Sequence, residues 1–102
     1  MAVGFEAMSM MVKSGKYDDA ATAMFDDLVA PSGKVKEAEK GALVEEIKAK
    51  LEEEHKNQLK TGLYNSSQKE MAVEATGQTV RWLREKLGIE MEKDTLAWRL
   101  GV

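Results

Sequence analysis

Residues 67–88 read SQKEMAVEATGQTVRWLREKLG, and this stretch organises the rest of the fold. Ser67 and Glu70 have the serine-x-x-glutamate spacing of a capping box, in which each side chain accepts a hydrogen bond from the other residue's backbone N–H. Gly88 stands where a glycine in the left-handed conformation commonly ends a helix. Apolar and small residues occupy more than half of the helical circumference between these two signals. We therefore predict that this stretch, up to Leu87, is the central core helix.

Two shorter helical segments lie at the start of the chain. Residues 2–14 are apolar around most of the helical circumference, and Gly15 is placed to end that helix. Because a helix of this kind needs burial on more than one side, we expect it to contact several neighbours. Residues 17–29 carry apolar side chains at helical spacing. We expect Pro31 to end this second helix, since the residue before a proline is pushed out of helical geometry.

A long and highly charged helix is predicted over residues 34–61, with Ser32 as its N-cap. Its apolar stripe consists of Leu43, Val44, Ile47 and Leu51. The same face continues with Glu54, His55 and Gln58, so the far end of this helix should project beyond the bundle. The opposite face carries Ala38, Ala42 and Ala49. These small side chains would let a second chain approach the helix closely.

Together these segments predict an all-α fold. A chain of 102 residues is expected to form one domain, so we assign residues 1–102 to a single compact helical bundle. The bundle has four main helices, and a short fifth helix is predicted over residues 94–100. We expect the first two helices to form a hairpin, the fourth to lie across that hairpin, and the third to pack along its apolar stripe.

Residues 15–20 read GKYDDA and are followed by Leu28 and Pro31. This combination resembles the middle and end of a tetratricopeptide repeat, and the resemblance implies a two-helix hairpin of the kind that binds other proteins. Met8 and Asp27 stand where that family usually has small residues, and no second copy follows in the sequence. Because stacking of about three repeats is normally needed for stability, we interpret the pattern as a local hairpin.

The composition argues against several classes of protein. The chain has no cysteine, a single histidine (His55), and no spacing that suits a metal-ligand set or a nucleophile with its base. We therefore expect a protein that is not an enzyme and has no cofactor, metal or small-molecule substrate. No run approaches the ~20 apolar residues of a membrane span, and Glu6 interrupts the apolar start, unlike a signal peptide. We expect a cytoplasmic protein or, if it is viral, one in the host cytoplasm or in a particle.

Acidic side chains are concentrated near the start of the chain. Residues 1–33 hold two lysines against five acidic residues, whereas the thirteen basic and thirteen acidic residues that follow cancel. Nucleic-acid binding depends largely on a basic surplus, and none is visible, so we do not expect nucleic acid as the partner. Asp26 and Asp27 are unusual because acidic residues in the last turn of a helix oppose the helix dipole.

We predict that the protein acts in protein–protein interaction or assembly, as an adaptor or structural protein that self-associates. Met8, Met10 and Met11 point to different sides of one helix, so a core within one protomer does not account for all of them. Methionine also adapts well to irregular partner surfaces. The predicted interface residues are Met8, Met10, Met11, Asp26, Asp27, Leu51 and His55.

Two alternative functions stay open. The first is a small DNA-binding regulator, in which residues 76–84 supply the turn and recognition helix of a helix-turn-helix. Arg81 and Arg84 would then contact phosphates or guanines, although Gln78 stands where an apolar residue is usual. The second is an acidic inhibitor of the kind encoded by phages and mobile elements. It would bind a basic host surface through Asp18, Asp19, Asp26 and Asp27.

Overall fold

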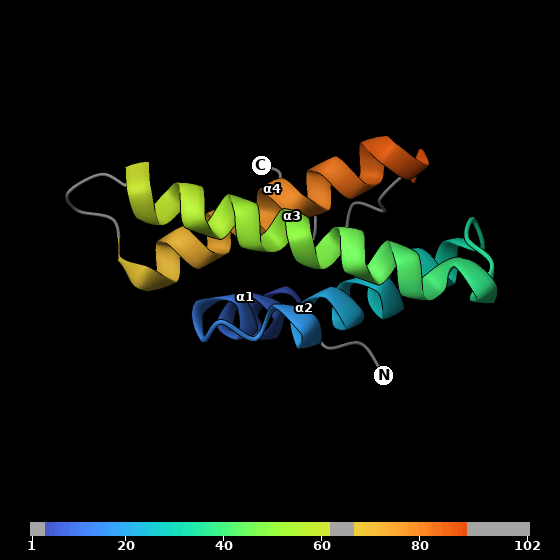
Figure 1. Ribbon diagram of the computed structural model, residues 1–102, viewed down its shortest axis with the longest axis horizontal. Helices are drawn as coiled ribbons and strands as arrows, with labels where there is room; N and C mark the ends of the chain where they lie inside the picture. The colour runs from blue at the N-terminus through green and yellow to red at the C-terminus, as the bar shows by residue number, and fades with distance from the viewer. Residues whose placement is uncertain (1–3, 62–66, 90–102) are drawn as a thin grey trace.

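The computed structural model describes residues 4–61 and 67–89, which form a bundle of four α-helices (Figure 1). The helices are α1 (Phe5–Lys13), α2 (Tyr17–Met24), α3 (Lys40–Thr61) and α4 (Gln68–Leu87). α3 and α4 lie side by side, and the α1–α2 hairpin packs beneath them, with α1 against α4 and α2 against α3. The predicted all-α bundle is thereby confirmed. The predicted helix over residues 94–100 lies outside the described residues.

The predicted C-terminal end of α1 and both predicted ends of α4 are confirmed by their hydrogen bonds and dihedral angles. The start of α1 differs from the prediction, because Gly4 is its N-cap and the helix begins at Phe5. Ser67 Oγ accepts a hydrogen bond from the Glu70 backbone N–H at 3.0 Å, and Glu70 Oε1 accepts one from the Ser67 N–H at 2.8 Å. These bonds hold the pKa of the Glu70 carboxyl below its ordinary value. Gly88 and Gly15 follow the two helices with φ of 66° and 78°, in the left-handed region that only glycine adopts at low cost.

α4 is a single uninterrupted helix, and this overturns one part of the DNA-binding alternative. The turn that a helix-turn-helix requires near residues 76–78 is absent, because Gly77 is buried within the helix itself. Thr76 and Thr79 are also fully buried, and their hydroxyls donate to backbone carbonyls one turn earlier, at 2.7 and 2.9 Å. This local bonding explains how two polar side chains are tolerated in the core.

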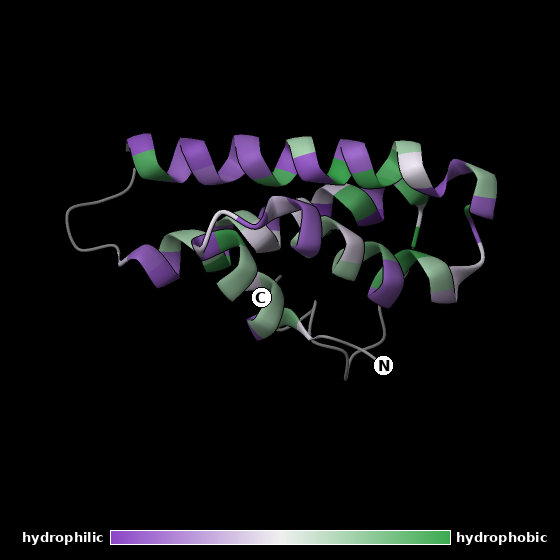
Figure 2. Cartoon of the chain, turned by 60° about the horizontal axis from the view of Figure 1, so that its bottom comes forward, coloured by the Kyte–Doolittle hydropathy of each residue, from purple (hydrophilic) through white to green (hydrophobic). Residues whose placement is uncertain are grey.

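One hydrophobic core connects the four helices that the structure describes. The largest fully buried side chains are Met24, Ile47, Leu51, Leu83, Val12, Val29, Thr76 and Thr79. On α3 the hydrophobic residues face the other helices and the hydrophilic residues face outward (Figure 2). The exposed side includes Ala42 and Ala49, as predicted, whereas Ala38 is exposed in the 3₁₀ turn before α3. Beyond His55 the described part of α3 has no buried side chain, in agreement with the predicted loss of its apolar face.

The segment that follows α2 differs from the prediction. Phe25–Val29 continues the helix as a π-helical turn, and Ala30–Ser32 then forms a 3₁₀ turn. Ala30 keeps helical dihedral angles, with φ −57° and ψ −45°, so the expectation that Pro31 forces it out of helical geometry is wrong. The proline lies in the first turn of the 3₁₀ segment, where its fixed φ is compatible with the helical backbone.

Ser32 does not cap α3 as predicted. Its Oγ donates a hydrogen bond to the carbonyl of Val29 at 2.6 Å and accepts one from the backbone N–H of Lys34 at 3.2 Å. Gly33 follows Ser32 with φ 68°, so the chain turns sharply at this point. A 3₁₀ turn at Glu37–Glu39 then leads into α3, which begins later than the sequence pattern suggested.

Candidate functional site

The structure places Met8, Leu51 and His55 in the core rather than at a partner surface. Their exposed fractions are 4%, 0% and 4%, so the prediction that they face another chain is wrong for this structure. Met8 is buried because it shares a helical face with Phe5 and Val12, and that face packs against α2 and α4. These three residues stabilise the protomer and are not available for docking.

Met10 and Met11 lie away from the buried face of α1. The side chain of Met10 is 46% exposed, and Met11 is half-buried at the edge of the core. Packing within one protomer therefore accounts for only part of the apolar circumference of α1. Of the predicted interface methionines, Met10 is the one that a partner can reach most fully.

His55 is buried because it has a hydrogen-bond partner on α2. Its Nδ1 lies 2.7 Å from the hydroxyl of Tyr17, and the two rings meet edge to face. His55 follows Ile47 and Leu51 at intervals of four, so it extends the apolar stripe of α3 by one turn. Its Nε2 is buried and has no hydrogen-bond partner among the residues that the structure describes. Burial lowers the pKa of His55, which keeps the ring neutral, and burial also raises the pKa of Tyr17.

Asp27 stabilises the start of α1 from a position far along the chain. Its Oδ2 accepts a hydrogen bond from the backbone N–H of Gly4 at 3.1 Å, across 23 positions of sequence. Gly4 is the N-cap residue of α1 and supplies no side-chain cap, and the Asp27 carboxylate accepts the hydrogen bond of this residue's own backbone N–H. A negative charge is favourable at this positive end of the helix dipole. The unusual position of this aspartate, in the π-helical turn after α2, is thereby explained.

We expect Asp27→Ala to lower the free energy of unfolding by about 1 kcal/mol, the typical net contribution of one intramolecular hydrogen bond. Urea denaturation followed by circular dichroism measures this loss. Asp26→Ala is the matched control, because the Asp26 carboxylate makes an exposed ion pair with Lys40 at 3.3 Å, worth about 0.5 kcal/mol or less. Equal losses in the two variants would contradict this role of Asp27.

The acidic surface of the inhibitor alternative is partly neutralised within the protomer. Asp18 pairs with Lys48 at 3.1 Å, Asp26 pairs with Lys40 at 3.3 Å, and Asp27 accepts the hydrogen bond from α1. These carboxylates connect α2 and the turn after it to α3 and α1. A basic partner would have to compete with those contacts, which weakens the case for an acidic docking surface.

A hollow of about 180 Å³ lies between α1 and the start of α4, and we call it the α1–α4 hollow. Its lining residues are Glu6, Ala7, Ser9, Met10, Lys69 and Val73. Ser9 is only 2% exposed, and its hydroxyl has no hydrogen-bond partner among the described residues. Apart from Met10, sequence reasoning missed this group, because only the packing of α1 on α4 brings the two distant segments together.

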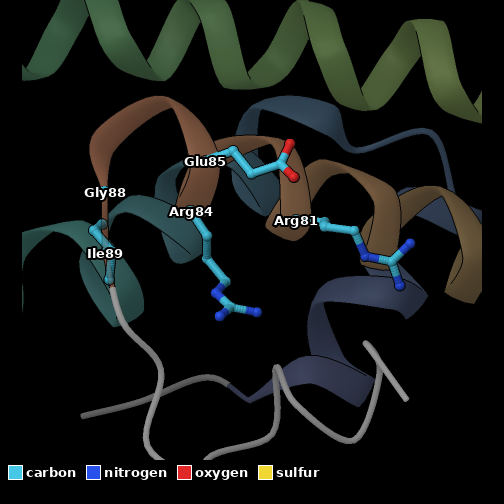
Figure 3. Close-up of a pocket in the computed structure, with 5 residues that line it drawn as sticks. All are labelled: Arg81, Arg84, Glu85, Gly88 and Ile89. Carbon is cyan, nitrogen blue, oxygen red and sulfur yellow. The ribbon is translucent and has the colours of Figure 1, made fainter.

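Arg81 and Arg84 line a second hollow, of about 380 Å³, at the C-terminal end of α4 (Figure 3). Glu85, Gly88 and Ile89 complete its described lining. We call this site the arginine hollow. Arg81 and Arg84 are three positions apart, so both lie on one side of α4, as predicted. Arg84 is half-buried there, and Arg81 is exposed.

The remaining tests for a known kind of site are negative within the described residues. No group of three or more metal-ligating side chains occurs in residues 4–61 and 67–89. None of the helices described is both long enough and apolar enough to cross a membrane. Comparison with protein-family models, curated proteins and solved structures gives no match.

Proposed function

We propose that the protein is a non-enzymatic assembly protein that self-associates through the α1–α4 hollow. The observation that carries this proposal is the 46% exposure of Met10 at a hollow whose other apolar walls are Ala7 and Val73. Water contact with such a surface is unfavourable by about 25 cal/mol per Å² of apolar area. A second copy that covers the hollow removes this cost.

The charges beside the hollow favour a second copy of the same chain as the partner. Glu6 and Lys69 both line the hollow and carry opposite charges. In a two-fold symmetric dimer the same patch faces itself, so residues that differ along the patch meet in reciprocal pairs. Glu6 of one protomer can then face Lys69 of the other, and the pairing occurs twice. A patch with a single sign of charge would instead repel its own copy.

The side chains at the centre of the hollow suit this arrangement. Methionine is unbranched and flexible, so Met10 of each protomer can fill the irregular hollow of the other. The buried Ser9 hydroxyl lacks a hydrogen-bond partner among the described residues. Because that hydroxyl is inaccessible from outside the protomer, we assign it no contact with the second chain.

The first test is the molar mass in solution, measured by light scattering on a size-exclusion column over a range of concentrations. We expect the native protein to form a concentration-dependent dimer and Met10→Glu to raise its dissociation constant at least about tenfold, because a charge enters the apolar centre. Leu59→Glu is the matched control, since Leu59 is 47% exposed and does not line the hollow. A native monomer at every concentration, or equal effects of both variants, would contradict the proposal.

A charge exchange tests the geometry of the pairing more closely. Glu6→Lys and Lys69→Glu should each weaken the dimer, because each places like charges opposite one another across the two-fold axis. The double variant should recover most of the affinity, since the reciprocal pairs form again with their signs exchanged. Absence of recovery would show that these two residues do not meet across the interface.

A further inference from the structure

The methionines of this chain differ widely in their access to a dissolved oxidant. The chain has no cysteine, so no thiol competes with methionine for an oxidant such as hydrogen peroxide. Five of the seven methionines lie in the described residues. Met8, Met24 and Met71 are 4%, 0% and 8% exposed, and Met11 is half-buried. Met10 is 46% exposed, so it is the described methionine that peroxide reaches most readily.

Oxidation changes the chemical character of a methionine side chain. The thioether sulfur attacks one oxygen of hydrogen peroxide, so an S–O bond forms while the O–O bond breaks. The hydroxide that leaves takes up the proton of the transferred oxygen and becomes water. The sulfur has then lost an electron pair to the peroxide, and the product is methionine sulfoxide. This side chain is polar and chiral, whereas methionine is apolar and flexible.

The position of Met10 makes this change unfavourable for self-association. Met10 lines the α1–α4 hollow together with the apolar side chains of Ala7 and Val73. A second chain that covers the hollow would bury the sulfoxide oxygen, and a buried polar group without a hydrogen bond is unfavourable. Lys69 is the cationic donor of the described lining, but the proposed dimer pairs it with Glu6 of the other protomer. The described lining therefore offers the sulfoxide oxygen no charged donor that the dimer leaves free.

We propose that Met10 is an oxidation site through which peroxide dissociates the dimer, an inference that rests on the proposed self-association. Met10 is exposed in the separated protomer and covered in the dimer, so the separated protomer reacts first. An oxidised protomer re-forms the dimer weakly, and the equilibrium therefore shifts toward single chains. Methionine sulfoxide reductases return the sulfoxide to the thioether, so the dissociation is reversible.

The fold itself should survive oxidation at Met10. This side chain lies away from the buried face of α1, which carries Met8 and Val12. A dose of peroxide that modifies the exposed methionine therefore changes the molar mass in solution and not the helical content. Sulfoxides at the buried Met8 or Met24 would instead disrupt the core, and a loss of circular dichroism would reveal them.

The test compares the full chain before and after treatment with hydrogen peroxide, at a protein concentration below the dissociation constant of the dimer. Peptide mass spectrometry identifies the oxidised methionines, and light scattering on a size-exclusion column gives the dissociation constant. Among the described methionines, Met10 should form its sulfoxide first. We expect the dissociation constant to rise about tenfold or more, with unchanged circular dichroism. Treatment with methionine sulfoxide reductases should restore the native value.

Three variants assign the effect to one sulfur. Met10→Leu keeps an apolar side chain of similar volume and has no sulfur at this position, so it should form the dimer but not respond to peroxide. Met11→Leu is the matched control, because it removes the neighbouring half-buried sulfur, and its dimer should respond as the native one does. Met10→Gln places a polar side chain of similar length at the hollow, so it should weaken the dimer without any oxidant.

Two results would overturn this inference and leave self-association standing. The first is a native dimer whose dissociation constant does not change when Met10 is oxidised. The second is a Met10→Leu dimer that peroxide weakens as much as the native one, because another methionine would then be responsible. A native chain that is monomeric at every concentration before oxidant is added contradicts the proposed function itself, and this inference fails with it.

Discussion

Leu51→Ala is expected to lower the free energy of unfolding by about 2–5 kcal/mol. The Leu51 side chain is 0% exposed and belongs to the core that connects the helices. Its truncation removes favourable burial and leaves a cavity that the surrounding helices fill only partly. A domain of this size has a total stability of only about 5–15 kcal/mol, so the variant should unfold at a markedly lower urea concentration.

The same experiment distinguishes a core residue from an interface residue. If Leu51 is part of the core, the loss of stability is the same at low and high protein concentration, whereas loss of a subunit contact is concentration-dependent. Leu59→Ala is the control, because Leu59 is 47% exposed and its truncation should change stability by about 0.5 kcal/mol or less. If the loss of unfolding free energy in Leu51→Ala disappears on dilution, Leu51 belongs to a subunit interface and not to the core.

The C-terminal end of α1 and both ends of α4 follow from chemistry that the sequence displays directly. Ser67 and Glu70 bond to each other within one turn, and Gly15 and Gly88 each adopt a conformation that depends on a single residue. No distant part of the chain decides these outcomes. The helical periodicity is equally local, and for this reason the all-α bundle could be predicted from the pattern of apolar residues.

The partition of the methionines in α1 is different, because it depends on neighbours that the sequence does not identify. A helical wheel gives the direction of Met8 and Met10 but not which direction meets α2 or α4. Met8 is 4% exposed and Met10 is 46% exposed, although both are apolar residues of the same helix. The wheel predicts that some apolar surface is left over, and the packing decides where it lies.

Contacts between distant positions could not be predicted from the sequence pattern, because the sequence does not identify which helices pack together. The hydrogen bond from Gly4 to Asp27 and the one between His55 and Tyr17 join residues 23 and 38 positions apart. Viewed alone, the aspartate opposes a helix dipole and the histidine seems suited to solvent. Each becomes favourable only when another helix supplies its partner. Both residues were predicted at a partner interface because those internal partners could not be seen.

Acidification from about pH 7 to about pH 5 is expected to destabilise the protein through His55. Burial lowers the pKa of His55 in the folded state, whereas the histidine of the unfolded chain titrates near its ordinary value of about 6.5. The unfolded chain therefore takes up the proton first, and the free energy of unfolding falls as the pH drops below that value. The fall ends below the lowered pKa of the folded state. Denaturant unfolding at a series of pH values measures it.

Two variants identify the source of this pH dependence. The His55→Gln variant has no titrating ring at this position but keeps a polar group near the Tyr17 hydroxyl. We expect its free energy of unfolding to be about 1 kcal/mol lower than that of the native chain at neutral pH. We also expect this free energy to lose its dependence on pH between about 7 and about 5. Tyr17→Phe removes the hydrogen bond to Nδ1 but leaves the imidazole buried, so the pH dependence should persist, because burial is the cause of the shift. Hydrogen bonds from the Lys56 side chain and the Ser67 backbone lower the pKa of the Glu52 and Glu70 carboxyls. Their contribution to stability is therefore lost mainly as the pH falls below about 4.3, the ordinary value for glutamate. If the free energy of unfolding of His55→Gln depends on pH as strongly as that of the native chain, a group other than His55 causes the pH dependence.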